Sequence, residues 1–140
     1  MAFFMKPWEK YLYAILRIVV GFLFIWHGSM KLFGYPPPFP GGGSMPMAII
    51  VIGGIIEFVG GLFIMFGLFT HVTAFIASGE MAVAYWMAHF PAALLPIQNQ
   101  GEMAVLYCFV FLFIAARGSG VWSIDSLIFK SSKESIRDDA

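Results

Sequence analysis

Residues 11–33 read YLYAILRIVVGFLFIWHGSMKLF, a stretch that is apolar over most of its length and is followed by Gly34. Three further apolar stretches follow at 45–69, 72–90 and 101–117. At a rise of 1.5 Å per residue, each of the first three would reach roughly 28 to 37 Å as a helix, and a hydrocarbon core is about 30 Å thick. The sequence therefore predicts four membrane-spanning helices, of which the fourth is short.

Prolines and glycines mark where the predicted helices end. The sequence GYPPPFPGGGSMP after the first helix cannot continue it. Gly67 and the pair Thr70-His71 separate the second helix from the third, which predicts a tight hairpin. A second loop, at 91–100, contains two prolines and precedes the fourth helix. We predict an all-α, integral membrane four-helix bundle that forms a single domain over residues 1–140, with a soluble tail at 126–140.

The composition of the whole chain favours a lipid environment. Of the 140 residues, 60% are hydrophobic and 11% are charged, whereas charged residues make up about 25% of a soluble protein. Mean hydropathy is +0.84. Eight basic and eight acidic residues balance each other, and no basic run is present that would bind nucleic acid. The lipid bilayer is therefore the expected partner, and nucleic acid is not.

Two features of the sequence bear on processing and on thiol chemistry. Cys108 is the single cysteine, so no intramolecular disulfide and no CxxC redox or metal motif can form. Lys6 and Lys10 precede the first apolar stretch, as they would in a signal peptide. However, Arg17 interrupts that stretch and no small-x-small cleavage site follows it. We therefore expect residues 11–33 to be a retained helix.

The distribution of Lys and Arg predicts the orientation in the membrane. Lys6 and Lys10 precede the first helix, and the tail after the fourth helix contains Lys130, Lys133 and Arg137. The two longer loops between helices contain neither residue type. By the positive-inside rule, both termini should be cytoplasmic and both longer loops should face the outer compartment. The predicted even number of helices agrees with this orientation.

Eight ionisable residues fall within or at the edges of the predicted helices: Arg17, His27, Lys31, Glu57, Glu80, His89, Glu102 and Arg117. A charge at mid-membrane costs about 2.5 to 3.5 kcal/mol, so such residues normally face the bundle interior and pair. Arg17 and Lys31 share one face of the first helix with Gly21 and Gly28. Glu57 lies on a glycine-rich face of the second helix. We expect these two faces to meet, because glycines permit close packing.

Helical rise, counted from the cytoplasmic side, separates the ionisable residues into two levels. At the inner level, Arg17 is expected to pair with Glu80 or Glu57 in an ion-pair network that fixes helix register. The outer level gathers residues near the outer loops: His27, Lys31, His89 and Glu102. Lys31, near a helix end, has the alternative of extending its ammonium group to the interface.

His27 and His89, at similar depth on different helices, raise the alternative of a bis-histidine haem. Together with Glu102 or Glu57 they also provide the ligand types of a metal site. Neither a haem signature nor a short metal-binding spacing accompanies them. The sequence therefore indicates no metal and no covalent cofactor, shows no redox centre of its own, and leaves open whether the protein is an enzyme.

Four motifs follow one another between Arg17 and Asp125: RIVVGFLFIWHGSMKLFG, EFVGGLFIMFGLFT, NQGEMAVLY and GSGVWSID. Together they resemble the DoxX family of small bacterial membrane proteins. The resemblance implies a four-helix protein of the bacterial cytoplasmic (inner) membrane. It also implies a redox or quinone-linked role, because some members are named after a subunit of a terminal quinol oxidase or of a thiosulfate:quinone oxidoreductase.

The resemblance transfers no catalytic residue. The positions that match the family's recurrent polar motif are His27, Lys31, Glu57, His89, Asn99, Glu102 and Asp125. One departure is the PPPFPGGG stretch after Tyr35, which changes the outer loop and any partner surface there.

We therefore predict a small subunit of a membrane electron-transfer complex that binds a quinone or contacts a redox partner at the outer level. A quinone needs an apolar cleft and a few groups that hydrogen-bond its carbonyls and move protons. The candidate ligand-binding residues are His27, Lys31, Glu57, His89, Asn99 and Glu102.

The alternative is a structural or assembly subunit that packs against larger membrane proteins, or against copies of itself, without chemistry of its own. A transporter is disfavoured, because four helices without evident inverted repeats rarely enclose a gated path.

Overall fold

The computed structural model describes residues 4–37 and 45–129. In these residues the chain is helical and contains no strand, so the predicted all-α class is confirmed there. The elements in chain order are η1 (Lys6–Trp8), α1 (Glu9–Phe33), α2 (Met47–Phe66), α3 (Thr70–Ala84), η2 (Tyr85–His89), α4 (Pro96–Asn99) and α5 (Glu102–Arg117). Residues 124–129 form a further short helical segment, and most of the predicted tail lies outside the described residues.

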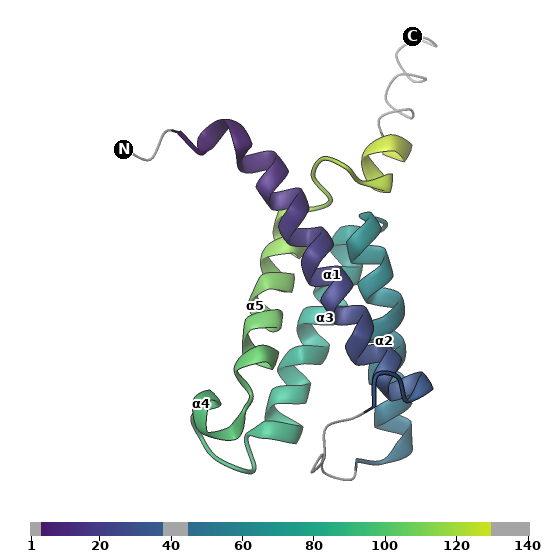
Figure 1. Cartoon of the computed structure of the whole chain (residues 1–140), viewed down its shortest axis with the longest axis vertical. Helices are drawn as coiled ribbons and strands as arrows, with labels where there is room; N and C mark the ends of the chain where they lie inside the picture. The colour runs from purple at the N-terminus through teal and green to yellow at the C-terminus, as the bar shows by residue number, and fades with distance from the viewer. Residues whose placement is uncertain (1–3, 38–44, 130–140) are drawn as a thin grey trace.

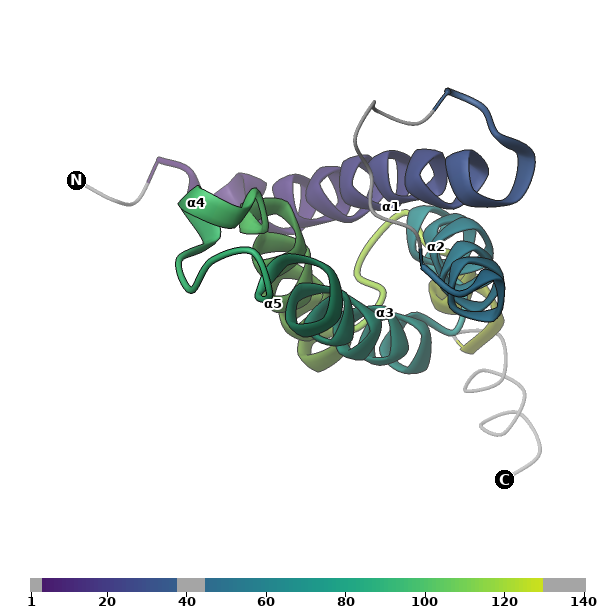
Figure 2. The same cartoon turned by 90° about the horizontal axis from the view of Figure 1, so that it is seen from below.

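Two of these helices are long and apolar enough to cross a bilayer: Lys6–Phe33, which joins η1 to α1, and Met47–Phe66. The helix α1 packs along α2, α3 packs along α5, and α2 contacts α3. Seen from below, α1, α2, α3 and α5 surround a common centre (Figure 2). The buried apolar core lies there and includes Phe24, Ile64, Ala77 and Phe111. All four helices therefore have an inward-facing side on which polar groups can meet.

Glycines bring the backbones of α1 and α2 into direct contact. A Cβ atom on Gly28 would lie 2.3 Å from the amide nitrogen of Phe58, and one on Gly21 would lie 2.6 Å from that of Met65. On the opposite helix, a Cβ on Gly61 would lie 2.9 Å from the carbonyl oxygen of Gly21. No side chain fits between the helices at these points. The predicted meeting of the two glycine-bearing faces is therefore confirmed, and it positions Lys31 beside α2.

The helix ends differ from the predicted ones where the backbone changes conformation. The second helix ends at Phe66 rather than at 69, because Gly67 adopts a left-handed φ of 68°. The third begins at Thr70, and its α-helical part ends at Ala84, where the π-helical turn η2 carries the chain on to His89. On a regular helix Glu80 and His89 would lie on opposite faces, and the π-helical turn changes the phase between them.

Candidate functional site

Arg17 is fully buried where α1 crosses the last turn of α2. One terminal nitrogen, Nη1, donates hydrogen bonds to the carbonyl oxygens of Ile64 at 2.7 Å and Met65 at 2.8 Å. The other, Nη2, donates to the carbonyl oxygens of Trp122 at 2.7 Å and Val121 at 3.4 Å. Carbonyls at a helix C-terminus carry partial negative charge and lack partners within the helix. Carbonyl oxygens therefore bind both terminal nitrogens without an acidic side chain, whereas Nε is buried and has no partner among the described residues.

The predicted pairing of Arg17 with Glu57 or Glu80 is wrong. In the part of the chain that the structure describes, the two ion pairs join Lys31 to Glu57 and Arg117 to Glu9. Counting rise along each helix assumes parallel helices, but α1 leans across the bundle and its first turns project beyond it (Figure 1). The depth of α1 residues is therefore overestimated: Arg17 reaches the end of α2, and Lys31 reaches the middle of the bundle.

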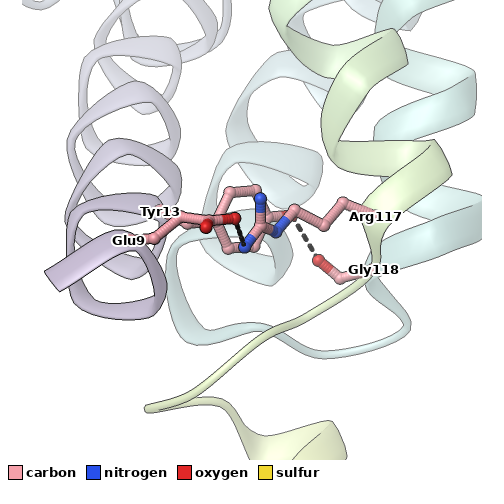
Figure 3. Close-up of polar contacts among 4 residues, drawn as sticks. All are labelled: Glu9, Tyr13, Arg117 and Gly118. Carbon is pink, nitrogen blue, oxygen red and sulfur yellow. Dashed lines mark hydrogen bonds and ion pairs between the residues drawn. The ribbon is translucent and has the colours of Figure 1, made fainter. Parts of the chain in front are cut away.

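The end of the bundle near Arg17 is held by polar contacts of a structural kind. Asp125, one of the motif residues, accepts hydrogen bonds from the backbone amides of Phe69 and Thr70 and from the Thr70 hydroxyl, at 2.8 to 3.0 Å. It therefore caps the first turn of α3. Figure 3 shows a second contact, in which the guanidinium of Arg117 lies over the Tyr13 ring, 4.5 Å from its centre.

Arg117 also makes the exposed ion pair with Glu9, at 3.0 Å. The Tyr13 hydroxyl donates a hydrogen bond to the carbonyl oxygen of Gly118. These contacts join the start of α1 to the end of α5 (Figure 3). Among the residues named here, Arg117 and Glu9 are therefore used in contacts within the chain.

Lys31 and Glu57 form the polar centre of the candidate site. The Lys31 ammonium donates a hydrogen bond to Oε1 of Glu57 at 2.8 Å. The Glu57 side chain is buried, whereas the Lys31 side chain is 35% exposed. The second carboxylate oxygen, Oε2 of Glu57, is buried and has no hydrogen-bond partner among the described residues. The pair thus uses one oxygen of the carboxylate and leaves the other available.

Glu80 adds a second acidic group from α3. A Cβ atom on Gly53 would lie 3.3 Å from Oε1 of Glu80 and 3.5 Å from the Lys31 ammonium, so both groups face the same point on α2. Glu80 also lies within electrostatic range of Glu57. Its Oε2 atom is buried and unpartnered in the described chain. Three helices therefore contribute two carboxyl groups and one ammonium group to one cluster.

A cavity of about 330 Å³ lies between α2 and α3, with Lys31 and Glu80 in its wall. The rest of its lining is apolar and includes Ile49, Ile52, Ile56, Ile76, Val83 and Met87. Several of these side chains are exposed on the outside of the bundle. The cavity thus combines an apolar groove, open at the side, with polar groups at one place, and its volume is in the range of small-molecule sites.

Tyr107 and His27 lie on the α1–α5 side of the same cluster. The buried Tyr107 ring packs against Phe24 and Phe111, each with centroids 5.5 Å apart. The His27 ring meets it edge-on, at 5.9 Å between centroids. The Tyr107 hydroxyl is buried without a hydrogen-bond partner in the described residues, and it lies within electrostatic range of Glu57. His27 itself is exposed.

Asn99 folds the loop before α5. Its amide nitrogen donates to the carbonyl oxygen of Ala93 at 2.8 Å, and its side-chain oxygen accepts from the Gly101 amide at 2.8 Å. Nδ1 of His89 lies 3.1 Å from the carbonyl oxygen of Asn99. Glu102 is exposed at the start of α5. The cavity wall contains neither His89 nor Asn99 nor Glu102.

The structure thus separates the predicted ligand-binding residues at this cluster from those at the loop before α5. Lys31, which the sequence placed at the outer level, comes together with Glu57 and Glu80 of the inner level. His27 is joined to this cluster through Tyr107. Across residues 4–37 and 45–129, no group of three or more His, Cys, Asp or Glu side chains is arranged to hold a metal ion.

Two features of the cluster escaped the sequence reasoning. Tyr107 was not singled out, although Ala104, Tyr107, Phe111 and Ile114 repeat at helical spacing and all are buried. That spacing marks the inward face of α5, and a tyrosine on it introduces a hydroxyl group into an apolar core. The cavity depends on Gly53 and Gly79, whose lack of side chains leaves the gap between α2 and α3 open.

Comparisons with known proteins agree with the motifs. The DoxX family model matches residues 12–90. An uncharacterized protein of Haemophilus influenzae is 38% identical over 130 residues, which cover 90% of this chain and 97% of that protein. The inner membrane protein YqjF of Escherichia coli is 28% identical over 130 residues, covering 90% and 98% of the two chains.

A protein of Bacillus subtilis named "Putative oxidoreductase CatD" is 26% identical over 121 residues, covering 85% of this chain and 88% of that protein. No solved structure matches the chain. The family match spans more than half of the sequence and includes the ion pair between α1 and α2. The chain is therefore a membrane protein of the DoxX family.

Proposed function

We propose that the chain crosses the bacterial cytoplasmic membrane four times, with both termini in the cytoplasm. The helices α1 and α2 are long enough to cross by themselves. The elements α3 and η2 run on from Thr70 to His89, which corresponds to roughly 30 Å of helix, and α5 provides roughly 24 Å. The described parts of these helices expose many large apolar side chains, which lipid would cover.

Aromatic side chains at both ends of the bundle support this arrangement. Near the start of α1, the rings of Trp8 and Tyr11 lie 6.2 Å apart, and those of Tyr11 and Trp122 lie 5.3 Å apart. Trp26 and Tyr35 pair toward the other end of α1. Trp and Tyr are enriched at membrane interfaces, where they bury a ring and keep a polar atom in water. The rise from Trp8 to Trp26 is roughly 27 Å, close to the thickness of a hydrocarbon core.

We propose further that the protein is a small subunit of a membrane electron-transfer complex and binds a quinone in the cavity between α2 and α3. The observation that carries this proposal is the joining of an apolar groove, open at the side of the bundle, to the Lys31, Glu57 and Glu80 cluster. The groove suits an apolar tail that extends into lipid. The ammonium group of Lys31 is a donor for a quinone carbonyl oxygen.

Two further facts support a redox role. One relative, from Bacillus subtilis, has oxidoreductase in its name, and the motifs resemble a family with quinone-linked members. The position of the cavity changes which of the predicted residues we propose as ligand-binding residues. Lys31, Glu57 and Glu80 become the proposed head-group residues, whereas His89, Asn99 and Glu102 become residues that organise the outer loop.

Filling the cavity tests this proposal. A Cβ on Gly79 would meet no atom within 4 Å, and Gly79 lines the cavity, so Gly79→Leu places a side chain in the groove without displacing the backbone. We expect the variant to fold normally and to bind a short-tailed benzoquinone about tenfold or more weakly than the wild type. Quenching of tryptophan fluorescence by the quinone in detergent measures the affinity.

Ala116→Leu is the matched control, because Ala116 is exposed on α5 in a separate groove between α3 and α5. It adds the same side chain outside the proposed site and should leave the affinity unchanged. Wild-type affinity in a correctly folded Gly79→Leu protein would show that the quinone does not occupy this cavity.

The role of an assembly subunit has an observation of its own in the loop before α5. Asn99 and the Tyr85 hydroxyl hold this loop through the carbonyl oxygens of Ala93 and Leu94. The side chains of Leu94, Leu95 and Ile97 are nevertheless exposed. A fixed loop with exposed apolar side chains is typical of a surface that packs against another membrane protein. Co-purification with large subunits, without any extractable quinone, would favour this role over quinone binding.

A further inference from the structure

Four titratable side chains cross the bundle from the cavity to its opposite side, and each comes from a different helix. Glu80 on α3 lies in the cavity wall and within electrostatic range of the buried Glu57 on α2. Tyr107 on α5 is buried within electrostatic range of Glu57, and the exposed His27 on α1 contacts the Tyr107 ring edge-on. In Figure 2 the four helices that supply them enclose one centre. From the sequence, His27 and Glu57 are ligand-binding candidates and Glu80 shares the inner level with Glu57, whereas Tyr107 was not singled out.

The buried members of this series have hydrogen-bonding capacity that the described residues do not use. Oε2 of Glu57, Oε2 of Glu80 and the hydroxyl of Tyr107 are all buried and unpartnered. Other buried side chains, such as Ser78 and Asn99, do find partners within the bundle. Buried polar atoms in native proteins are paired with protein groups or with ordered water. Unused oxygens on three neighbouring side chains are therefore sites for bridging water.

The balance of charges in the cluster requires one of its carboxyl groups to hold a proton. Lys31 supplies one positive charge to a cluster that contains the two carboxyl groups of Glu57 and Glu80. An unbalanced charge inside a membrane is costly. The cluster is neutral when one carboxyl group holds a proton. Because Lys31 binds Oε1 of Glu57, that carboxylate is held by the ammonium group, and Glu80 is the group that holds the proton.

We propose that Glu80, Glu57, Tyr107 and His27 form a proton path between the cavity and the exposed face of α1, a proposal that rests on the quinone site proposed above. The path would carry away a proton that a bound quinol releases when it is oxidised by a partner subunit. His27 lies roughly 9 Å of helical rise before the last residue of α1, so protons would leave toward the end of the bundle where α1 and α2 are connected.

A proton passes along the path in successive transfers, each of which has a donor and an acceptor. A proton leaves Oε2 of Glu80 for a bridging water, and that water passes a proton to Oε2 of Glu57. Glu57 transfers a proton, through water, to the Tyr107 oxygen while the Tyr107 hydroxyl proton moves, through a second water, to the imidazole of His27. Release of a proton from His27 to solvent restores Glu57, Tyr107 and His27 to their starting states. The bound quinol then reprotonates Glu80, so one passage moves one proton from the quinol to solvent. Full oxidation of one quinol releases two protons and two electrons, so it needs two passages and an electron acceptor in the partner subunit that takes both electrons.

Hydrogen–deuterium exchange at Glu80 tests the path without any quinone. A protonated carboxyl group gives an infrared carbonyl band that shifts when its proton is replaced by deuterium. We expect such a band in the wild-type protein and its loss in Glu80→Gln. After transfer to D2O, we expect Tyr107→Phe and His27→Phe to slow the shift of the band about tenfold or more. Tyr107→Phe removes one hydroxyl group and keeps the ring that packs on Phe24 and Phe111.

Tyr11→Phe is the control, because Tyr11 lies near the start of α1 beside Trp8 and Trp122. It should exchange at the wild-type rate. The path is overturned if Glu80→Gln removes no carboxyl band, or if Tyr107→Phe and His27→Phe both exchange as fast as the wild type. Failure of the quinone site would appear separately, as wild-type protein that binds no short-tailed benzoquinone, whatever the exchange rates are.

Discussion

Replacing Arg17 with methionine is expected to lower the free energy of unfolding by about 3 kcal/mol or more, because each buried acceptor left without its donor costs roughly 1 to 3 kcal/mol. The substitution removes the donors for four carbonyl oxygens at the end of α2 and in the segment after α5. Methionine preserves most of the volume but cannot donate a hydrogen bond. Unfolding by sodium dodecyl sulfate in mixed micelles, followed by circular dichroism, measures the loss.

Arg117→Met is the matched control for Arg17→Met. The guanidinium of Arg117 makes its ion pair with Glu9 on the surface, where both side chains are exposed in part. Exposed ion pairs contribute about 0 to 1 kcal/mol. A loss in Arg17→Met no larger than in Arg117→Met would contradict the role given to the buried guanidinium group.

Replacing Lys31 with methionine is expected to have the second-largest effect, a loss of about 2 kcal/mol. This value lies below the range for a fully buried pair because the Lys31 side chain is 35% exposed. Without its ammonium group, the buried Glu57 carboxylate has no opposite charge beside it and has Glu80 as a neighbour. The variant should also lose binding of a short-tailed benzoquinone, since Lys31 is the proposed donor to the carbonyl.

A double variant separates the two effects. In Lys31→Met/Glu57→Met the uncompensated charge is gone, so most of the lost stability should return. Quinone binding should stay lost, because the donor is still missing. Recovery of both properties in the double variant would mean that Lys31 acts only as the counter-charge of Glu57. Additive losses of stability would mean that the two side chains are not coupled in the folded protein.

The contact between α1 and α2 could be predicted from the sequence because glycine spacing alone defines it. Gly21 and Gly28 lie on one face of α1 and leave room for backbone only, and the structure uses both positions for contact with α2. The depth of individual charges was harder to predict. Counting rise along straight, parallel helices placed Lys31 and Glu80 at different levels, and the lean of α1 brings them to one.

The partners of Arg17 could not be predicted from side chains because they are backbone atoms. Carbonyl oxygens become available where α2 ends at Gly67 and where residues 121–122 pass beside that end. The positions of charged residues in the sequence indicate neither the end of α2 nor the path of residues 121–122. The same is true of Asp125, whose acceptors face backbone amides of α3. Opposite charge alone therefore predicts Glu57 and Glu80 as the partners of Arg17.

The candidate site was predicted in part. Lys31 and Glu57 were identified because charged residues in apolar helices are unusual, and they do pair across α1 and α2. His89 and Glu102 were grouped with Lys31 by depth, but depth does not determine which way a residue faces. The π-helical turn at Tyr85–His89 sets His89 against the loop, and Glu102 starts α5 in an exposed position. The cavity itself arises from the absence of side chains at Gly53 and Gly79.

Photo-crosslinking with an azido-benzoquinone in native membranes tests the central claim most directly. The proposal predicts adducts on residues of α2 and α3 that line the cavity, such as Ile52, Ile76 and Val83, and loss of these adducts in Gly79→Leu. Adducts confined to residues 91–102, or labelling of α2 and α3 that Gly79→Leu leaves unchanged, would contradict a quinone site between these helices.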